Sequence, residues 1–205
     1  MRIIAGKYRG RNLKSPPSLE VRPTSDRLRE TLFNVIAPRI EGARFLDLCA
    51  GSGAVGIEAL SRGASHATFV DRSRRMCSLI RSNLDLCRIE EAESEVVQSE
   101  SHDYLRRAIG KPRRSFSRWD IVFFDPPYAA DYLEVLDAFG AYASTLLIET
   151  GLVIVEHHHK SPLSDGVGSL LRTRVLKQGD SALSFYGLQA TGKWSNPEVR
   201  GGSAV

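Results

Sequence analysis

Four consecutive residues, Asp125-Pro126-Pro127-Tyr128, combine a carboxylate, two prolines and an aromatic ring directly after the apolar run of residues 121–124. Proline has no N–H and restricts the residue before it to extended backbone, so this segment is stiff and leaves its carbonyls free. A carboxylate, a free carbonyl and an aromatic face together suit the binding of a flat base with an exocyclic amine. The alternative is a turn that only ends a strand, with Tyr128 as a packing residue.

A glycine-rich turn lies upstream of this segment. Residues 45–49 form a short apolar run typical of a strand buried in a parallel sheet, and residues 54–60 have the pattern of a helix. A strand, a glycine turn and a helix in succession let the backbone approach a nucleotide-like ligand without an intervening side chain. The residues that we expect to line this ligand are Ala50, Gly51, Ser52 and Gly53.

Two aspartates narrow the choice of ligand. The turn fits the G-x-G-x-x-G pattern of dinucleotide-binding folds. However, Asp47 places a carboxylate near the end of the strand, and a negative charge there does not favour the binding of a phosphate. A cofactor with a cationic amino-acid end, such as S-adenosylmethionine, suits that carboxylate. Asp71 follows the next predicted strand, residues 67–70, where doubly wound folds bind ribose hydroxyls. Asp71 could instead cap the helix that begins near Ser73, and the two roles are compatible.

Alternating strands and helices are predicted around these residues. Strands are predicted at residues 45–49, 67–70, 121–124 and 152–155, and a further strand is predicted to end at residues 96–97. Helices are predicted at residues 54–60, from about 73 onward and at 132–142, with an earlier one that begins at Thr24 and ends at Pro38. Residues 172–177 and 183–188 form a final antiparallel hairpin. This order indicates an α/β fold, and the carboxyl ends of parallel strands would gather the candidate residues.

The composition is that of one soluble domain of 205 residues, with 42% hydrophobic and 25% charged residues. No apolar run approaches a membrane span, and three cysteines without a Cys-x-x-Cys pair predict reduced thiols in the cytoplasm. His157-His158-His159 looks like a metal cluster, but consecutive histidines at a strand end point to alternating faces. We therefore expect no metal, and we expect a monomer.

The net charge of +4 is concentrated in two stretches. The first stretch, residues 1–14, has no acid and could form a short basic hairpin that binds RNA phosphates with the cations Arg2, Lys7, Arg9, Arg11 and Lys14. The alternative is a solvated arm without a partner. The second stretch, residues 106–118, leads into the strand at 121–124 and should lie at the edge of the sheet opposite the ligand. We expect it to be a solvated loop or a distal RNA contact.

Four sequence blocks occur in one order, at residues 2–11, 22–34, 47–53 and 125–128. In this order they resemble the bacterial methyltransferases that modify a guanine N2 in small-subunit (16S) ribosomal RNA. The resemblance extends to about residue 189. The first two blocks are the specific ones, because many amino-methyltransferases share the last two.

The resemblance implies a Rossmann-like class I methyltransferase with a seven-stranded, mostly parallel sheet, a C-terminal antiparallel hairpin and a small N-terminal basic hairpin. It implies S-adenosylmethionine as cofactor, Asp125 to Tyr128 as the catalytic segment, and Glu100 and Ser101 near the adenine. It also places Arg22 and Arg27 near the mouth of the site. The expected divisions are an N-terminal hairpin and linker (1–20), a methyltransferase domain (21–190) and a disordered tail (191–205).

Three other functions remain open. A DNA adenine or protein glutamine amino-methyltransferase would share the segment Asp125 to Tyr128. A nicotinamide dehydrogenase would share the glycine turn but would leave that segment unexplained. A non-enzymatic RNA-binding protein of ribosome assembly would keep the basic N-terminal stretch. The expected partner is ribosomal RNA or a small-subunit assembly particle.

Overall fold

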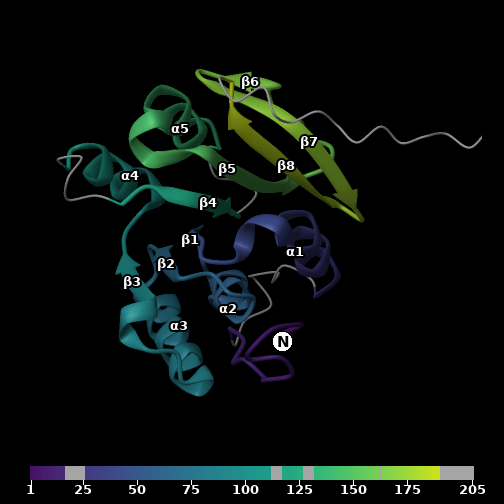
Figure 1. Ribbon diagram of the computed structural model, residues 1–205, viewed down its shortest axis with the longest axis vertical. Coiled ribbons are helices and arrows are strands. Elements are labelled where there is room, and N and C mark those ends of the chain that lie inside the picture. The colour runs from purple at the N-terminus through teal and green to yellow at the C-terminus, as the bar shows by residue number, and fades with distance from the viewer. Residues whose placement is uncertain (17–25, 112–116, 127–131, 162, 190–205) are drawn as a thin grey trace, which may run out of the picture.

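The computed structural model describes residues 1–16, 26–111, 117–126, 132–161 and 163–189. One eight-stranded sheet runs through it in the order β3-β2-β1-β4-β5-β8-β7-β6 (Figure 1). The strands are β1 (Arg44–Leu48), β2 (His66–Asp71), β3 (Ser94–Gln98), β4 (Trp119–Phe124), β5 (Leu147–His158), β6 (Gly166–Val167), β7 (Leu170–Gln178) and β8 (Ser181–Leu188). The first five strands pair with one another in parallel, and β8, β7 and β6 follow β5 in antiparallel pairs.

Helices cover both faces of the sheet (Figure 1). The helices are α1 (Asp26–Ile40), α2 (Ala54–Ser61), α3 (Arg74–Cys87), α4 (Ser101–Ile109) and α5 (Tyr132–Leu146), with a 3₁₀ turn, η1 (Glu91–Glu93). Side chains of α1, α2 and α3 form one hydrophobic core with one face of the strands, and α4 and α5 form a second core with the other face. Both faces are buried, which explains why β1 and β4 read as continuous apolar runs. No described helix has the length and apolarity to cross a bilayer.

The predicted α/β fold is confirmed, with two differences in detail. The sheet has eight strands rather than seven, because the two-residue strand β6 pairs with β7 at the edge. Pro38 does not end its helix, since α1 continues to Ile40. Proline in the last turn forfeits one backbone hydrogen bond, and its own φ is compatible with a helix. The residues that would begin that helix, including Thr24, and the tail 191–205 lie outside the described residues.

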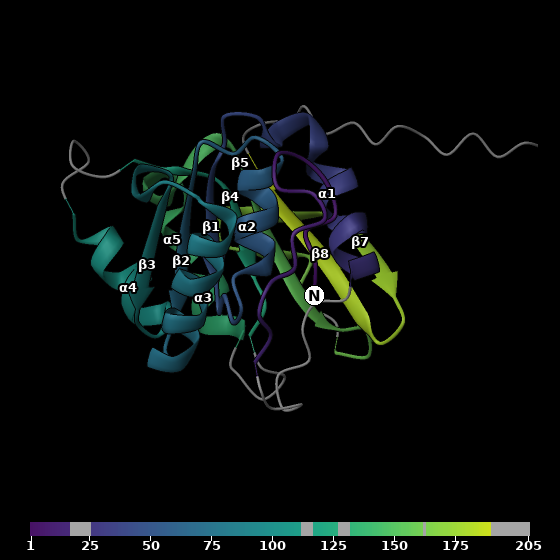
Figure 2. The same ribbon diagram turned by 90° about the horizontal axis from the view of Figure 1, so that it is seen from below.

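The N-terminal segment, residues 1–16, runs beside α1 and α2 (Figure 2) and contributes side chains to the core. It folds back on itself through a bridge between Arg2 and Asn12, as expected of a basic hairpin. However, Ile3, Tyr8 and Leu13 are at most 5% exposed and pack in the core of α1 and α2. The segment therefore is not a detachable arm, and its deletion would uncover this core. Tyr8, the aromatic residue of this basic segment, is a core residue.

A buried carboxylate on α2 holds this segment in place. Glu58 is 0% exposed and accepts hydrogen bonds from the backbone N–H groups of Ile4 (2.8 Å) and Ala5 (3.0 Å). Its Oε1 also forms an ion pair with Arg62, at 2.7 Å. A buried charge is tolerated when it is paired and hydrogen-bonded, so Glu58 and the segment depend on each other.

Arg29 reinforces the same contact from α1. It is 0% exposed and its Nη2 donates to Asp26 Oδ1 (2.7 Å) and to the carbonyl of Arg2 (2.8 Å). Burial lowers the pKa of the guanidinium, and the charge of Asp26 opposes that effect. Arg29 therefore joins α1 to the N-terminal segment.

Candidate functional site

The two candidate motifs follow adjacent strands of the sheet. β1 and β4 pair in parallel with Leu48 opposite Phe124, so the glycine turn and Asp125 leave the sheet side by side at its carboxyl edge. The backbone N of Asp125 donates to the carbonyl of Leu48, at 3.4 Å. Pro126 follows and is buried, whereas Pro127 and Tyr128 lie outside the described residues. The strand order reverses between β1 and β4, and open α/β sheets bind ligands at such a point.

The turn after β1 has the backbone geometry of a ligand-binding loop. Cys49, Gly51 and Gly53 have φ values of 60°, 55° and 77°. A Cβ on Gly53 would lie 3.2 Å from Ile80, so glycine serves both conformation and packing there. Cys49 adopts this left-handed conformation although it has a side chain, so its backbone is strained. Strained backbone of this kind is common at functional sites.

Asp47 lies within the base of the turn. It is 2% exposed, and its Oδ2 accepts a hydrogen bond from the backbone N of Gly56 (2.9 Å). Burial raises the pKa of Asp47 to about 7, against the lowering effect of that hydrogen bond. Asp47 thus fixes the first turn of α2 to the sheet, and its contact with a cationic cofactor end stays a prediction.

Replacing Asp47 with Asn tests this arrangement by pH. The raised folded-state pKa means that the folded protein binds more protons than the unfolded chain between pH of about 4 and 7. The stability of the wild type should therefore fall as pH rises through this window. Asn keeps an acceptor for Gly56 without the charge, so the variant should melt several degrees higher at pH 8 and equally at pH 4. If the melting temperatures of the wild type and Asp47→Asn differed by the same amount at pH 4 and at pH 8, the raised pKa of Asp47 would be contradicted.

Asp71, at the end of β2, joins the turn to the start of α3. Its Oδ2 accepts from the backbone N of Gly51 (2.9 Å) and its Oδ1 from that of Ser73 (2.8 Å). Burial raises the pKa of Asp71, and the two backbone hydrogen bonds oppose the rise. A carboxylate offers about four acceptor sites, so two remain for the hydroxyls of a ribose. The residues present therefore fit the ribose of S-adenosylmethionine.

Replacing Asp71 with Ala should weaken the binding of S-adenosylmethionine by about 5–150-fold, which corresponds to roughly 1–3 kcal/mol for one or two lost hydrogen bonds. Isothermal titration calorimetry measures this loss directly. Asp85→Ala is the control, because Asp85 is an exposed acid farther along α3. Unchanged affinity in Asp71→Ala would mean that this carboxylate only fixes the backbone of the turn.

The other predicted cofactor residues divide into an exposed and a buried one. Glu100 is exposed and lies 3.7 Å from Arg72 in an ion pair, which accounts for an acid at this position without any ligand. Ser101 is buried, and its Oγ lies 3.4 Å from the Sγ of Cys49. Burial raises the pKa of Cys49 to about 12, so the thiol is neutral. Ser101 therefore connects α4 to the glycine turn, and a contact with adenine stays a prediction for both residues.

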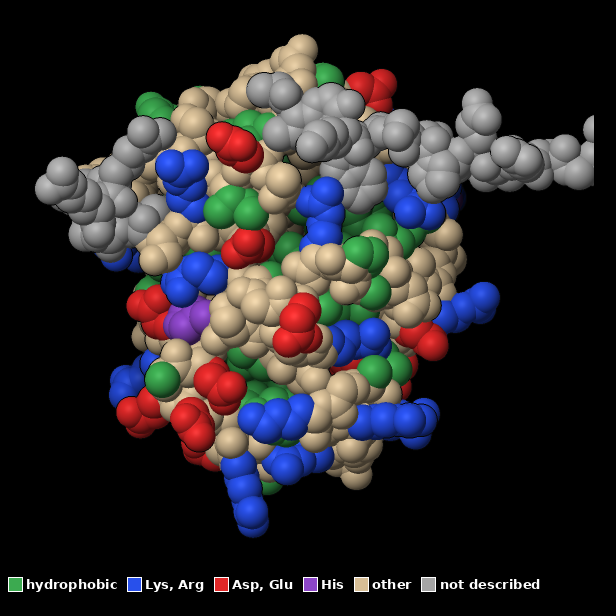
Figure 3. Space-filling model, in the orientation of Figure 1, with side chains coloured by type: hydrophobic (Ala, Val, Ile, Leu, Met, Phe, Trp, Pro, Cys, Tyr) green, Lys and Arg blue, Asp and Glu red, His purple; other side chains and the backbone are tan. Residues whose placement is uncertain are grey.

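The predicted RNA-binding cations are on the surface. Arg2, Lys7, Arg9 and Arg27 are exposed, and Arg11 is half-buried where it donates to the carbonyl of Leu86. In Figure 3, Lys and Arg side chains gather at the lower edge of the visible face, where α3 and the N-terminal segment lie in Figure 1. Arg22 lies outside the described residues.

The second basic stretch has local partners where the structure describes it. Arg106 forms an ion pair with Asp103 (2.8 Å), and Arg107 donates to the hydroxyl of Ser99 (2.6 Å). Both are on α4, and the described part of the stretch continues into the start of β4, at the edge of the sheet opposite Asp125. These neighbours favour the interpretation as a solvated surface; Arg113 and Arg114 lie outside the described residues.

The three consecutive histidines divide into one buried ring and two adjacent ones. The expected alternation of faces is wrong for His158 and His159, whose rings stack with centroids 4.9 Å apart. His157 is buried against the hydroxyl of Ser184, whereas His158 and His159 come within 4.8 Å of Asp180 and one another. His158 Nδ1 accepts from the backbone N of Lys160, so its neutral ring carries the proton on Nε2. Binding a metal ion through His158 would cost this hydrogen bond or require the other tautomer, and we assign no metal to this group.

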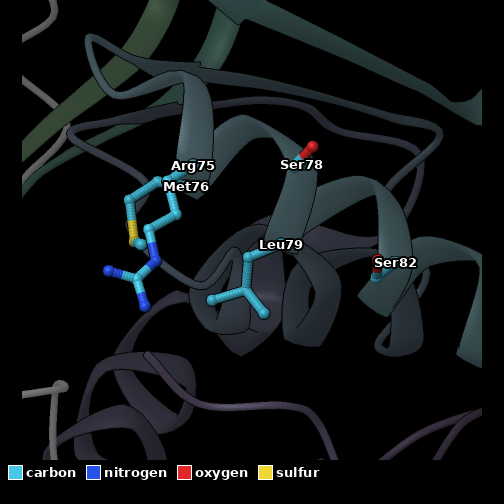
Figure 4. Close-up of a pocket in the computed structure, with 5 residues that line it drawn as sticks. All are labelled: Arg75, Met76, Ser78, Leu79 and Ser82. Atoms are coloured by element: carbon cyan, nitrogen blue, oxygen red, sulfur yellow. The ribbon is translucent and has the colours of Figure 1, made fainter. Parts of the chain in front are cut away.

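A hollow of about 200 Å³ lies on α3, and none of the residues predicted to bind the cofactor lines it. Figure 4 shows that its five lining residues come from this one helix: Arg75, Met76, Ser78, Leu79 and Ser82. It offers no carboxylate for a ribose, and its lining is mainly apolar. The glycine turn therefore stays the predicted cofactor site, and this hollow does not replace it.

Known proteins share both the sequence and the fold. The family model described as Conserved hypothetical protein 95 matches residues 1–187. Ribosomal RNA small subunit methyltransferase D of Escherichia coli K12 is 38% identical over 197 residues, which are 94% of this chain and 92% of that protein. The protein of the same name in Haemophilus influenzae is 36% identical over 169 residues, 80% of this chain and 81% of that protein.

Solved structures agree. The structure of yhhF from Escherichia coli has 33% identity and a TM-score of 0.79, covering 93% of this chain and 98% of its own. A hypothetical protein of Thermus thermophilus has 31% identity and a TM-score of 0.76, covering 92% and 99%. The fold is also that of SMU.776, a methyltransferase candidate solved with SAH, at 17% identity and a TM-score of 0.64, covering 82% of this chain and 50% of that one. The chain therefore belongs to the Conserved hypothetical protein 95 family, together with the small-subunit ribosomal RNA methyltransferases D.

Proposed function

We propose that this chain transfers a methyl group from S-adenosylmethionine to the exocyclic N2 amine of a guanine in small-subunit ribosomal RNA. The observation that carries the proposal is the pairing of β1 with β4, which places the glycine turn beside Asp125 and Pro126. The names of the full-length relatives support ribosomal RNA as the substrate. Three free cysteines and an RNA substrate both favour action in the cytoplasm.

Methyl transfer requires that the guanine amine be made more nucleophilic and be held in line with the methyl group. The guanine N2 lone pair is delocalised into the ring, so the amine is a poor nucleophile. The Asp125 carboxylate and the Pro126 carbonyl would accept its two hydrogens and localise the lone pair, and Tyr128 would stack on the base for about 1–3 kcal/mol. Bound S-adenosylmethionine supplies an electrophilic methyl group. The amine can lose its proton after methylation, so no strong base is needed.

A base paired or stacked within RNA must turn outward to reach Asp125. The N-terminal segment would hold the surrounding RNA by its phosphates while the base is displaced. Because this segment packs on α2, and α2 continues from the glycine turn, the RNA would be held on the same rigid elements as the cofactor. Alignment of this kind lowers the barrier to transfer without new chemistry.

Charge reversal at Arg9 tests the RNA contact. Arg9 is exposed, so Arg9→Glu should leave the melting temperature unchanged. Affinity for structured RNA should fall, and the slope of log affinity against log salt should flatten by about one. Arg174→Glu, on an exposed position of β7, is the matched control. Equal affinities and salt slopes in the wild type and Arg9→Glu would remove Arg9 from the RNA-binding surface.

Calorimetry with S-adenosylmethionine and with NAD separates the enzyme classes. We expect binding of S-adenosylmethionine and none of NAD. With the labelled cofactor, small-subunit RNA should accept methyl groups, whereas DNA and protein should not. Transfer to DNA adenine or to protein glutamine would favour the related amino-methyltransferases, and an absence of cofactor binding would favour a non-enzymatic RNA-binding protein.

A further inference from the structure

Asn83 on α3 joins three parts of the chain that are distant in sequence. Its side chain is 0% exposed. Its Nδ2 donates to the carbonyl of Ser52 (2.9 Å) and to the carbonyl of Lys14 (3.1 Å), and its Oδ1 accepts from the backbone N of Lys14 (2.8 Å). Both amide hydrogens and the amide oxygen are therefore used.

The two partners of Asn83 belong to the two proposed binding sites. Ser52 lies in the glycine turn, next to Gly51, whose N–H is held by Asp71. Lys14 ends the basic stretch of the N-terminal segment, which the proposed function assigns to RNA. Met1 of the segment also reaches the turn, with its Sδ 3.9 Å from the Ser52 Oγ. The segment thus lies directly against the cofactor turn, and Asn83 fixes the backbone of both.

Packing alone does not explain an amide here. A buried amide is costly unless its hydrogen bonds are made, and apolar residues of similar size fill a core at no such cost. What the amide adds is direction, because three hydrogen bonds hold the Ser52 carbonyl and the backbone of Lys14 in one relative position. Neighbouring core positions of α3, Ile80, Leu84 and Cys87, fill space without this constraint.

We propose that Asn83 is a positioning residue that couples the binding of the cofactor to the binding of RNA. The proposal rests on the proposed function, because it takes the two ligands from there. A ligand that orders the glycine turn also orders the Asn83 amide and Lys14, so the second ligand has less conformational entropy to lose. The coupling must act equally in both directions. We expect each ligand to tighten the binding of the other by about tenfold, within the range of known couplings.

Calorimetry measures this coupling with S-adenosylhomocysteine, which cannot react, and unmethylated small-subunit ribosomal RNA. S-adenosylhomocysteine is titrated into the full chain alone and into the chain saturated with RNA, and the coupling factor is the ratio of the two affinities. Asn83→Asp keeps the size and the acceptor for Lys14 but directs a carboxylate at two carbonyl oxygens. Its coupling factor should fall from about ten to about one. Asn34→Asp, an exposed position of α1, makes the same chemical change and should keep the wild-type factor.

Melting temperatures show which variants are folded, and Asn83→Ser replaces Asn83→Asp if the carboxylate prevents folding. A variant that binds both ligands more weakly but keeps the wild-type coupling factor has lost packing alone, and this would overturn the proposal. A wild-type factor of one, with both ligands bound, would also overturn it and leave the proposed function standing. If the wild type does not bind S-adenosylhomocysteine, the proposed function itself fails.

Discussion

Replacing Asp125 with Ala is expected to lower the turnover of methyl transfer by about 10²–10³-fold, the usual cost of losing one preorganised polar group at a reacting centre. The affinity for S-adenosylmethionine should change little, because the contacts predicted for the cofactor come from the turn after β1 and from Asp71. Asp125 lies at the end of β4, beside that turn, where an amine would meet the methyl group. Single-turnover kinetics with saturating RNA measure the step itself.

Asp125→Asn tests whether the carboxylate itself, and not only the size of the side chain, is required for turnover. Asn keeps the shape of the side chain but replaces one acceptor oxygen with a donor, so its turnover should also fall. Asp137→Asn is the control, since Asp137 is an exposed acid of α5. Near-normal turnover in both Asp125 variants would exclude the carboxylate from the reaction.

Replacing Glu58 with Ala is expected to destabilise the protein by about 3–5 kcal/mol, the cost of breaking a buried ion pair. The change leaves Arg62 without its partner and the N–H groups of Ile4 and Ala5 without acceptors. Chemical denaturation at constant pH gives the free energy of unfolding. Glu30→Ala, at an exposed position of α1, should change it by less than about 0.5 kcal/mol.

Affinity for RNA should fall in Glu58→Ala even where the chain is still folded, because the N-terminal segment loses its anchor. Affinity for S-adenosylmethionine should fall less. A stability within about 0.5 kcal/mol of the wild type would show that the segment is held without Glu58.

The sequence predicts the sheet and the strand ends well because these follow from local patterns. The apolar run at residues 121–124 and the glycine turn at 51–56 each signal a buried strand and its exit, and β4 and β1 lie there. Parallel pairing then brings Asp125 to the turn without any further information. The sequence offers Asp71 either as a helix cap or as a ribose ligand. The N-cap of α3 is Ser73, whose side chain accepts from the backbone N of Met76, so the cap alternative is wrong and the ribose contact stays a prediction.

The contacts that the sequence does not predict are those between distant residues. Glu58, Arg29 and Asn83 read as ordinary polar positions of helices, and only the fold shows that each is fully buried. Their partners lie between 27 and 69 residues away, except where Arg29 also pairs with Asp26 and Glu58 with Arg62. No local pattern encodes such a partner. For the same reason the basic stretch at residues 1–14 reads as a free arm although Ile3 and Tyr8 are core residues.

Mapping the methyl group on the RNA tests the proposed reaction directly. Small-subunit particles from a strain that lacks this gene would be incubated with the purified protein and labelled S-adenosylmethionine, and the RNA digested and separated by mass spectrometry. We expect N2-methylguanine at a single nucleotide of the treated particles. It should be absent from untreated particles of the deletion strain and from particles treated with the Asp125→Ala protein. A label found in protein, in DNA or on another atom of the RNA bases would contradict the proposed reaction.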